Sequence, residues 1–199
     1  ADIYQAVNRA NYMLYKLDEV TFLTDAEKKD YQGQLRFLRA LHYFNLVRLY
    51  GGVPLKLLPT LNDKPENFLP RSSVNEVYSQ IISDLEFARL NIQVQNPEKA
   101  TALAATALLA SVELTLGNAA AARDYASQVL DERPQLELSY KDLFTSTSEP
   151  GPEILFYIPY NATDKNRLAE YNYPYSLGGR HENAPSAILA SVDGNDKRK

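Results

Sequence analysis

The chain has 199 residues with 21 basic and 25 acidic side chains, which gives a net charge of −4 at pH 7. This balance argues against a nucleic-acid partner, because nucleic-acid binding usually requires a strongly basic surface. Cysteine is absent, which excludes disulfides, thiolate zinc sites and cysteine nucleophiles from this sequence. No apolar run reaches about 18 residues, so no segment is expected to span a bilayer.

Two helices are predicted in the first 50 residues. The first covers residues 2 to about 20, where apolar residues recur at spacings of three and four and the letters AVNRANYML occur. The second begins at Thr24 and ends near residue 50. Thr24 and Glu27 have the spacing of a capping box, which marks a helix start.

The second half of that long helix carries large apolar residues on nearly every side of the helical wheel, which is typical of a helix surrounded by other helices. Three arginines interrupt them: Arg36, Arg39 and Arg48. Arginines in such surroundings pair with buried carboxylates or carbonyls more often than with ligands, so we expect an architectural role. Gly51 and Pro54 predict a sharp end to the helix.

Residues 51–71 contain four prolines with little periodicity, and they are predicted to form an extended excursion. The next helix is predicted to begin with the capping box of Ser73 and Glu76. Alanine-rich residues 100–116 and the following residues 119–131 predict two further helices with small side chains, which favour an antiparallel hairpin.

The composition changes after residue 134, so we expect a helical body over 1–134 and a loop-rich portion with a short strand over 135–199. Residues 139–144 fit a single helical turn. Residues 153–160 are rich in branched and aromatic side chains and predict a short β-strand.

A tyrosine- and asparagine-rich stretch follows, in a sequence that has 14 tyrosines and no tryptophan. Aromatic faces stack on sugar rings, and planar amide or guanidinium donors bind hydroxyls, so this stretch is the candidate ligand site. An alternative is that these tyrosines pack the strand onto the helices, and the lack of tryptophan weakens the sugar interpretation. The candidate residues are Arg167, Tyr171, Asn172, Tyr173, Tyr175 and Arg180.

The sequence offers little for catalysis or metal binding. His42 and His181 lie far apart without a metal-ligand spacing, and both are interpreted as structural groups. The nucleophile elbow and the glycine-rich phosphate loops are absent. A glycosidase needs two carboxylates on either side of a bond, and the sequence has no motif that places such a pair. We therefore expect no enzyme activity, no cofactor and no metal.

Several segments together resemble the SusD/RagB-like family of outer-membrane nutrient-binding lipoproteins. In chain order they are AVNRAN, RFLRALHYFNLVRLYGGVPL, PRSSVNEVY, the alanine-rich helix pair, EILFYI and a loop containing GGR. The resemblance implies a mainly α fold, a single SusD-like domain of tetratricopeptide-like helix pairs with long irregular loops and little strand. It also implies further sequence before Ala1 and after Lys199, so we expect a fragment or a trimmed form.

The resemblance further implies a function. Members of the family capture oligosaccharides at the outer surface of the outer membrane and deliver them to a SusC-like TonB-dependent transporter. The implied membrane attachment is a lipid anchor upstream of this sequence. Two alternatives stay open: peptide capture by a RagB-like component, or a generic helical-repeat adaptor that docks another protein and uses no ligand residues between 160 and 183.

Overall fold

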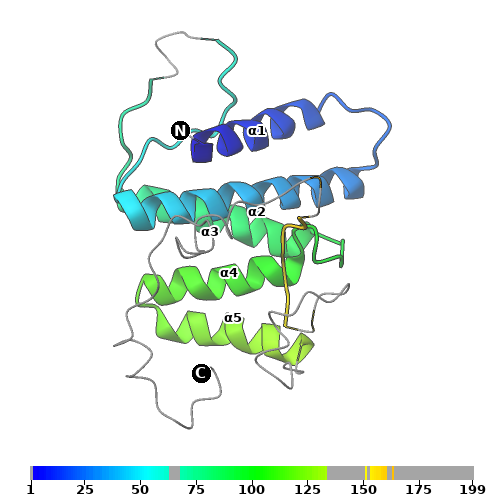
Figure 1. Cartoon of the computed structure of the whole chain (residues 1–199), viewed down its shortest axis with the longest axis vertical. Helices are drawn as coiled ribbons and strands as arrows, with labels where there is room; N and C mark the ends of the chain where they lie inside the picture. Colours follow the sequence, from blue (N-terminus) through cyan, green and yellow to red (C-terminus); the bar gives the residue numbers. More distant parts are fainter. Residues whose placement is uncertain (1, 63–67, 134–150, 152, 161–162, 164–199) are drawn as a thin grey trace, which may run out of the picture. The chain divides into compact units, whose positions relative to one another are not determined.

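The computed structural model describes residues 2–62, 68–133, 151, 153–160 and 163. These residues contain five helices and no strand, which confirms the predicted mainly helical fold. The chain divides into two units, and the unit made of Ala1–Pro134 and Ile154–Tyr157 holds every described helix (Figure 1). The helices are α1 (Asp2–Leu17), α2 (Asp25–Tyr50), α3 (Val74–Asn91), α4 (Ala102–Thr115) and α5 (Ala119–Glu132).

Each helix packs against the next one in the sequence, so that α1, α2, α3, α4 and α5 follow one another through the unit (Figure 1). The long helix α2 contacts α1 on one side and α3 on the other, with a smaller contact to α4. The predicted central position of α2 is therefore confirmed. The helices α4 and α5 form the predicted antiparallel pair, joined by a short turn at Gly117.

Two capping boxes start the helices where the sequence predicts them. Thr24 Oγ1 accepts the Glu27 N–H at 3.3 Å, and Glu27 Oε2 accepts the Thr24 N–H at 2.8 Å. Ser73 and Glu76 repeat this arrangement at the start of α3, with distances of 3.3 and 2.7 Å. Each box satisfies backbone donors that have no partner inside the first turn.

Two glycines let the chain leave α2 and return toward α3. Gly51 adopts a φ of +69°, a conformation that favours glycine, and donates its N–H to Val47 O at 2.9 Å. A side-chain carbon on Gly52 would lie 2.2 Å from Ser72 O, so only glycine fits there without a shift. Ser72 in turn donates its N–H to Val53 O at 3.0 Å. The segment that leaves α2 is thereby tied to the segment that enters α3.

The core lies among α2, α3 and α4, with one face of α1 added to it. Its apolar side chains come from helical positions three and four apart, as the sequence predicts. The largest fully buried side chains are Tyr43, Ile81, Leu85, Leu109, Val7, Val77, Val112, Asn11 and Asp84. Asn11 and Asp84 are polar, and their partners belong to the cluster described below.

The predicted strand at residues 153–160 is wrong, because the described part of the chain holds no strand there. Instead Leu155 and Phe156 pack against the helical core, and the Phe156 ring meets Phe37 edge-on at 5.2 Å between centroids. Tyr157 donates its N–H to Pro97 O at 2.9 Å. Leu155 and Phe156 thus serve as packing groups on the helices, whereas Ile158 and Tyr160 are exposed. The helical turn predicted at 139–144 lies outside the described residues.

Candidate functional site

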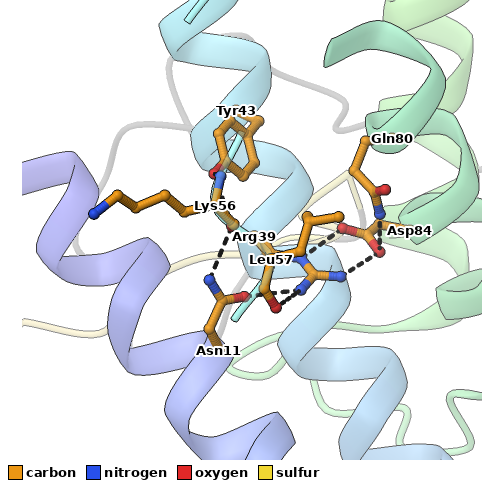
Figure 2. Close-up of polar contacts among 7 residues, drawn as sticks. All are labelled: Asn11, Arg39, Tyr43, Lys56, Leu57, Gln80 and Asp84. Carbon is orange, nitrogen blue, oxygen red and sulfur yellow. Dashed lines mark hydrogen bonds and ion pairs between the residues drawn. The ribbon is translucent and has the colours of Figure 1, made fainter. Parts of the chain in front are cut away.

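The predicted ligand residues lie outside the part of the chain that the structure describes. They are Arg167, Tyr171, Asn172, Tyr173, Tyr175 and Arg180. Among the described residues, a cluster of polar groups lies where α1, α2 and α3 meet the start of the 51–71 excursion (Figure 2).

The centre of this cluster is a buried ion pair between α2 and α3. Arg39 is 6% exposed and donates from Nε to Asp84 Oδ2 at 2.8 Å and from Nη2 to Oδ1 at 2.7 Å (Figure 2). This two-bond geometry is the strongest form of arginine–carboxylate pairing. Gln80 adds a third donor, from Nε2 to Asp84 Oδ1 at 3.0 Å. The fully buried carboxylate is therefore well satisfied.

The remaining Arg39 nitrogen extends the cluster to α1 and to the excursion. Nη1 donates to Asn11 Oδ1 at 2.8 Å and, more weakly, to Leu57 O at 3.5 Å. Asn11 then donates from Nδ2 to Lys56 O at 2.9 Å and to Leu58 O at 3.4 Å. The amide of Asn11 thus connects the ion pair to the backbone of the excursion.

Three more side chains hold the same stretch of backbone. The Tyr43 hydroxyl accepts the Lys56 N–H at 2.6 Å and donates to Lys56 O at 2.9 Å, and burial raises the pKa of this hydroxyl. On α1, the Tyr4 hydroxyl donates to Pro54 O at 2.8 Å, and Asn8 Oδ1 accepts the Thr60 N–H at 2.7 Å.

We call these five side chains the loop clamp: Tyr4, Asn8, Asn11, Arg39 and Tyr43. All of them contact backbone atoms between residues 54 and 60, so the clamp holds the path of the loop whatever its side chains are. The clamp also gives a physical reason for two stretches noted in the sequence. AVNRAN supplies both asparagines, and RFLRALHYF supplies the arginine and the second tyrosine.

The expected architectural role of the three arginines is confirmed for Arg39 by its ion pair. Arg48 stays within α2, where it donates to Phe44 O at 3.4 Å and to Asn45 Oδ1 at 2.7 Å. Arg36 differs, because its guanidinium stacks over the Phe87 ring at 4.0 Å and makes no hydrogen bond to a described residue. Among the described residues Arg36 therefore has no hydrogen-bonded carboxylate or carbonyl partner, although the charge of Asp84 acts on it.

Of the clamp residues, only Arg39 was singled out from the sequence; Tyr4, Asn8, Asn11 and Tyr43 were missed, as was the Asp84 carboxylate. Asn11 follows Val7 by four positions and so lies on the apolar face of α1, where a polar residue requires a partner. Asp84 lies in the same way between Ile81 and Leu85 on α3. A buried polar residue on an apolar helix face is the sequence feature that could have identified both.

Two surface hollows adjoin the clamped loop. One, of about 320 Å³, is lined by clamp residues Tyr4 and Asn8 together with the exposed Phe68 and Leu69. A wider one, of about 580 Å³, lies by the start of α1 and the end of α2, where Arg71 donates to Gly52 O at 2.6 Å and to Tyr50 O at 2.7 Å. Both hollows have mixed polar and apolar linings.

Metal and membrane features are absent from the described residues. No cluster of three or more histidine, cysteine, aspartate or glutamate side chains in the described ranges could hold a metal ion. His42 is half-buried, and burial lowers its pKa. None of the described helices is both long enough and apolar enough to cross a bilayer.

Comparison with known proteins places this geometry in a family. A SusD-like family model, described as "Starch-binding associating with outer membrane", matches residues 1–114. SusD-like protein P2 of Formosa agariphila is 33% identical over 138 residues, which cover 64% of this chain and 27% of that protein. The starch-binding protein SusD of Bacteroides thetaiotaomicron is 29% identical over 145 residues, which cover 67% of this chain and 25% of that protein.

The solved structures agree with the sequence comparison. A laminarin-binding SusD-like protein superposes with a TM-score of 0.60 at 31% identity, over 69% of this chain and 30% of that one. The chain spans between 25% and 37% of the length of the curated relatives it matches. Residues 1–114, which the family model matches, include all five residues of the loop clamp. The chain belongs to the SusD-like family.

Proposed function

We propose that this protein binds an oligosaccharide at the outer surface of the outer membrane, without chemical change to the sugar, and delivers it to a SusC-like TonB-dependent transporter. The observation that carries the proposal is the family match over residues 1–114, whose description names starch binding and association with the outer membrane. The similarity to a starch-binding protein and to a laminarin-binding one supports a glucan as the class of ligand.

The ligand contacts are assigned to the tyrosine- and arginine-rich stretch at residues 167–180. Tyrosine rings offer flat apolar faces for the C–H groups of a sugar, while amide and guanidinium groups bind hydroxyl oxygens. In this division of roles, the helical body with its loop clamp provides a rigid support, and the following stretch provides the contacts. A lipid anchor upstream of residue 1 would hold the protein at the membrane beside its transporter.

Isothermal titration calorimetry against maltoheptaose, laminariheptaose, a xyloglucan heptasaccharide and unrelated peptides tests the proposal. We expect binding to at least one glucan, and about tenfold weaker binding, or about 1.4 kcal/mol, for Tyr171→Ala or Tyr173→Ala. Tyr31→Ala is the matched control, because Tyr31 is a tyrosine of α2 that is 46% exposed and is not one of the proposed contact residues. Chromatography of the sugar after overnight incubation should recover it unchanged.

Binding of peptides with no binding of sugars would replace the glucan by a peptide ligand. Hydrolysis of the sugar would refute the non-enzymatic role. If neither tyrosine variant differs from the Tyr31→Ala control while a glucan still binds, the contacts lie outside residues 167–180.

A further inference from the structure

A third surface hollow, of about 340 Å³, lies beside the loop clamp and has no role in the clamp itself. It is bounded by the second half of α1, the first half of α2 and residues 57–59 of the excursion. Its volume falls at the lower end of the range of small-ligand sites, roughly 300–1,000 Å³. The lining residues are Asn11, Leu14, Tyr15, Asp18, Gln32, Arg36, Arg39, Leu57, Leu58 and Pro59.

The polar lining groups of the hollow divide into those already satisfied and those still free to bind. Arg39 donates hydrogen bonds to Asp84 and Asn11, and Asn11 donates one to the loop backbone at Lys56 O. Arg36 does not, because its Nε is buried and has no hydrogen-bond partner among the described residues. Buried donors in proteins are nearly always satisfied, so this nitrogen is an exception. It is shielded from solvent where it stands, so a ligand in the hollow reaches the Arg36 guanidinium when the side chain turns from its position over the Phe87 ring.

The rim of the hollow adds three groups of complementary kinds. Tyr15 is 48% exposed and supplies an aromatic ring, with Lys16 Nζ 5.5 Å from the ring centre. Asp18 is exposed and supplies acceptors, and the half-buried Gln32 supplies a donor and an acceptor. The side chains of Asp18 and Gln32 make no hydrogen bond to another described residue. As far as the described residues go, the polar rim is therefore open to a ligand.

The charges of these groups select the kind of ligand. The cation of Arg36 and the anion of Asp18 line the same hollow, so a negatively charged ligand would meet both attraction and repulsion. A neutral ligand with many hydroxyls can use both, because a hydroxyl donates to a carboxylate and accepts from a guanidinium. The aromatic ring and the leucines of the loop suit the C–H face of such a ligand.

We propose that this hollow binds one hexose unit of the captured glucan, which makes it a second contact point in addition to residues 167–180. Tyr15 stacks on the sugar ring, Arg36 donates to its hydroxyl oxygens, and Asp18 and Gln32 complete the hydrogen bonds. This inference rests on the proposed function, since it assumes that the ligand is a neutral oligosaccharide. It assigns a binding role to a residue of the RFLRALHYF stretch that has no part in the loop clamp.

Calorimetry with maltoheptaose and laminariheptaose tests the second contact point through variants of its own residues. We expect Tyr15→Ala and Arg36→Met each to weaken binding of the preferred glucan at least fivefold. Tyr12→Ala is the matched control, since Tyr12 is 43% exposed on the same helix but does not line the hollow. Methionine is chosen at position 36 because it keeps the contact with the Phe87 ring.

A second readout locates the sugar without any substitution. The Nε–H resonance of Arg36 in a proton–nitrogen NMR spectrum should shift as glucan is added. The dissociation constant fitted to this shift should equal the one found by calorimetry. This resonance decides the question if Arg36→Met fails to fold.

The outcomes separate this inference from the proposed function. If Tyr15→Ala and Arg36→Met bind glucan as the wild type does and the Arg36 resonance stays fixed, the second contact point is overturned while glucan binding stands. If the wild type binds no sugar, both are overturned. If the hollow binds a peptide instead of a glucan, the hexose assignment is wrong.

Discussion

Replacing Arg39 by methionine removes the central group of the buried cluster while keeping a side chain of similar length. The guanidinium donates two bonds to Asp84, one to Asn11 and a longer one to Leu57 O. Without it, the carboxylate of Asp84, which is 0% exposed, keeps only Gln80 as a donor. A buried charge that loses its partner typically costs about 3–5 kcal/mol.

Urea unfolding followed by circular dichroism at 222 nm measures this loss. With a slope of roughly 2 kcal/mol per molar urea, the Arg39→Met variant should unfold at a midpoint lower by roughly 2 M. The loss is a large part of the 5–15 kcal/mol by which domains are usually stable, so the variant is expected to fold only marginally.

The double variant Arg39→Met with Asp84→Leu provides the control for this interpretation. Because it leaves no unpaired charge, it should regain most of the stability that Arg39→Met loses. A loss below about 1 kcal/mol for Arg39→Met would refute the account of the cluster as a satisfied ion pair. So would a double variant whose loss equals the sum of the two single losses, because the two residues would then be uncoupled.

Three further predictions concern the loop and α2. Tyr43→Phe removes both bonds to Lys56, so it should cost about 1–2 kcal/mol and speed tryptic cleavage after Lys56. Gly52→Ala places a carbon 2.2 Å from Ser72 O and should lower the unfolding free energy by about 1–3 kcal/mol in urea titration. Burial lowers the pKa of His42, so the unfolded state takes up its proton first as pH falls below about 6.5. The unfolding free energy should therefore decrease as the pH is lowered further. The His42→Gln variant should show a weaker dependence of the unfolding free energy on pH.

A specific result would contradict each of these three predictions. Unchanged cleavage after Lys56, measured against cleavage after Lys16, would mean that Tyr43 does not hold the loop. A Gly52→Ala variant as stable as the wild type would show that the two segments are not in close contact. An identical pH dependence in the His42→Gln variant would assign the effect to other titrating groups.

The helices could be predicted from sequence because their determinants are local. Thr24 with Glu27 and Ser73 with Glu76 each form a complete start within four residues, and both are present in the structure. Gly51 ends α2 by a property of its own backbone. Features of this kind need no knowledge of the rest of the fold.

The loop clamp could not be predicted in the same way, because its partners are distant in sequence. Arg39 and Asp84 are 45 positions apart and meet only once α2 and α3 have packed together. The sequence correctly predicted a buried partner for Arg39 but could not identify that partner as Asp84. For Arg36 the described residues provide an aromatic ring in place of a hydrogen-bonded partner.

The strand predicted at 153–160 was wrong for a related reason. Its branched and aromatic residues have strand propensity, but a strand needs a neighbouring strand, and the helices offer an apolar surface instead. The predicted ligand residues between Arg167 and Arg180 lie outside the described part of the chain, so their role stays a prediction.

Affinity electrophoresis in native gels that contain laminarin, starch or xyloglucan tests glucan binding most directly, because it needs neither a labelled ligand nor a variant. We predict that at least one of these polysaccharides slows the protein relative to a gel without polysaccharide, and that bovine serum albumin as a reference is not slowed. Equal mobility of the protein in all four gels would contradict the proposal that it captures a glucan.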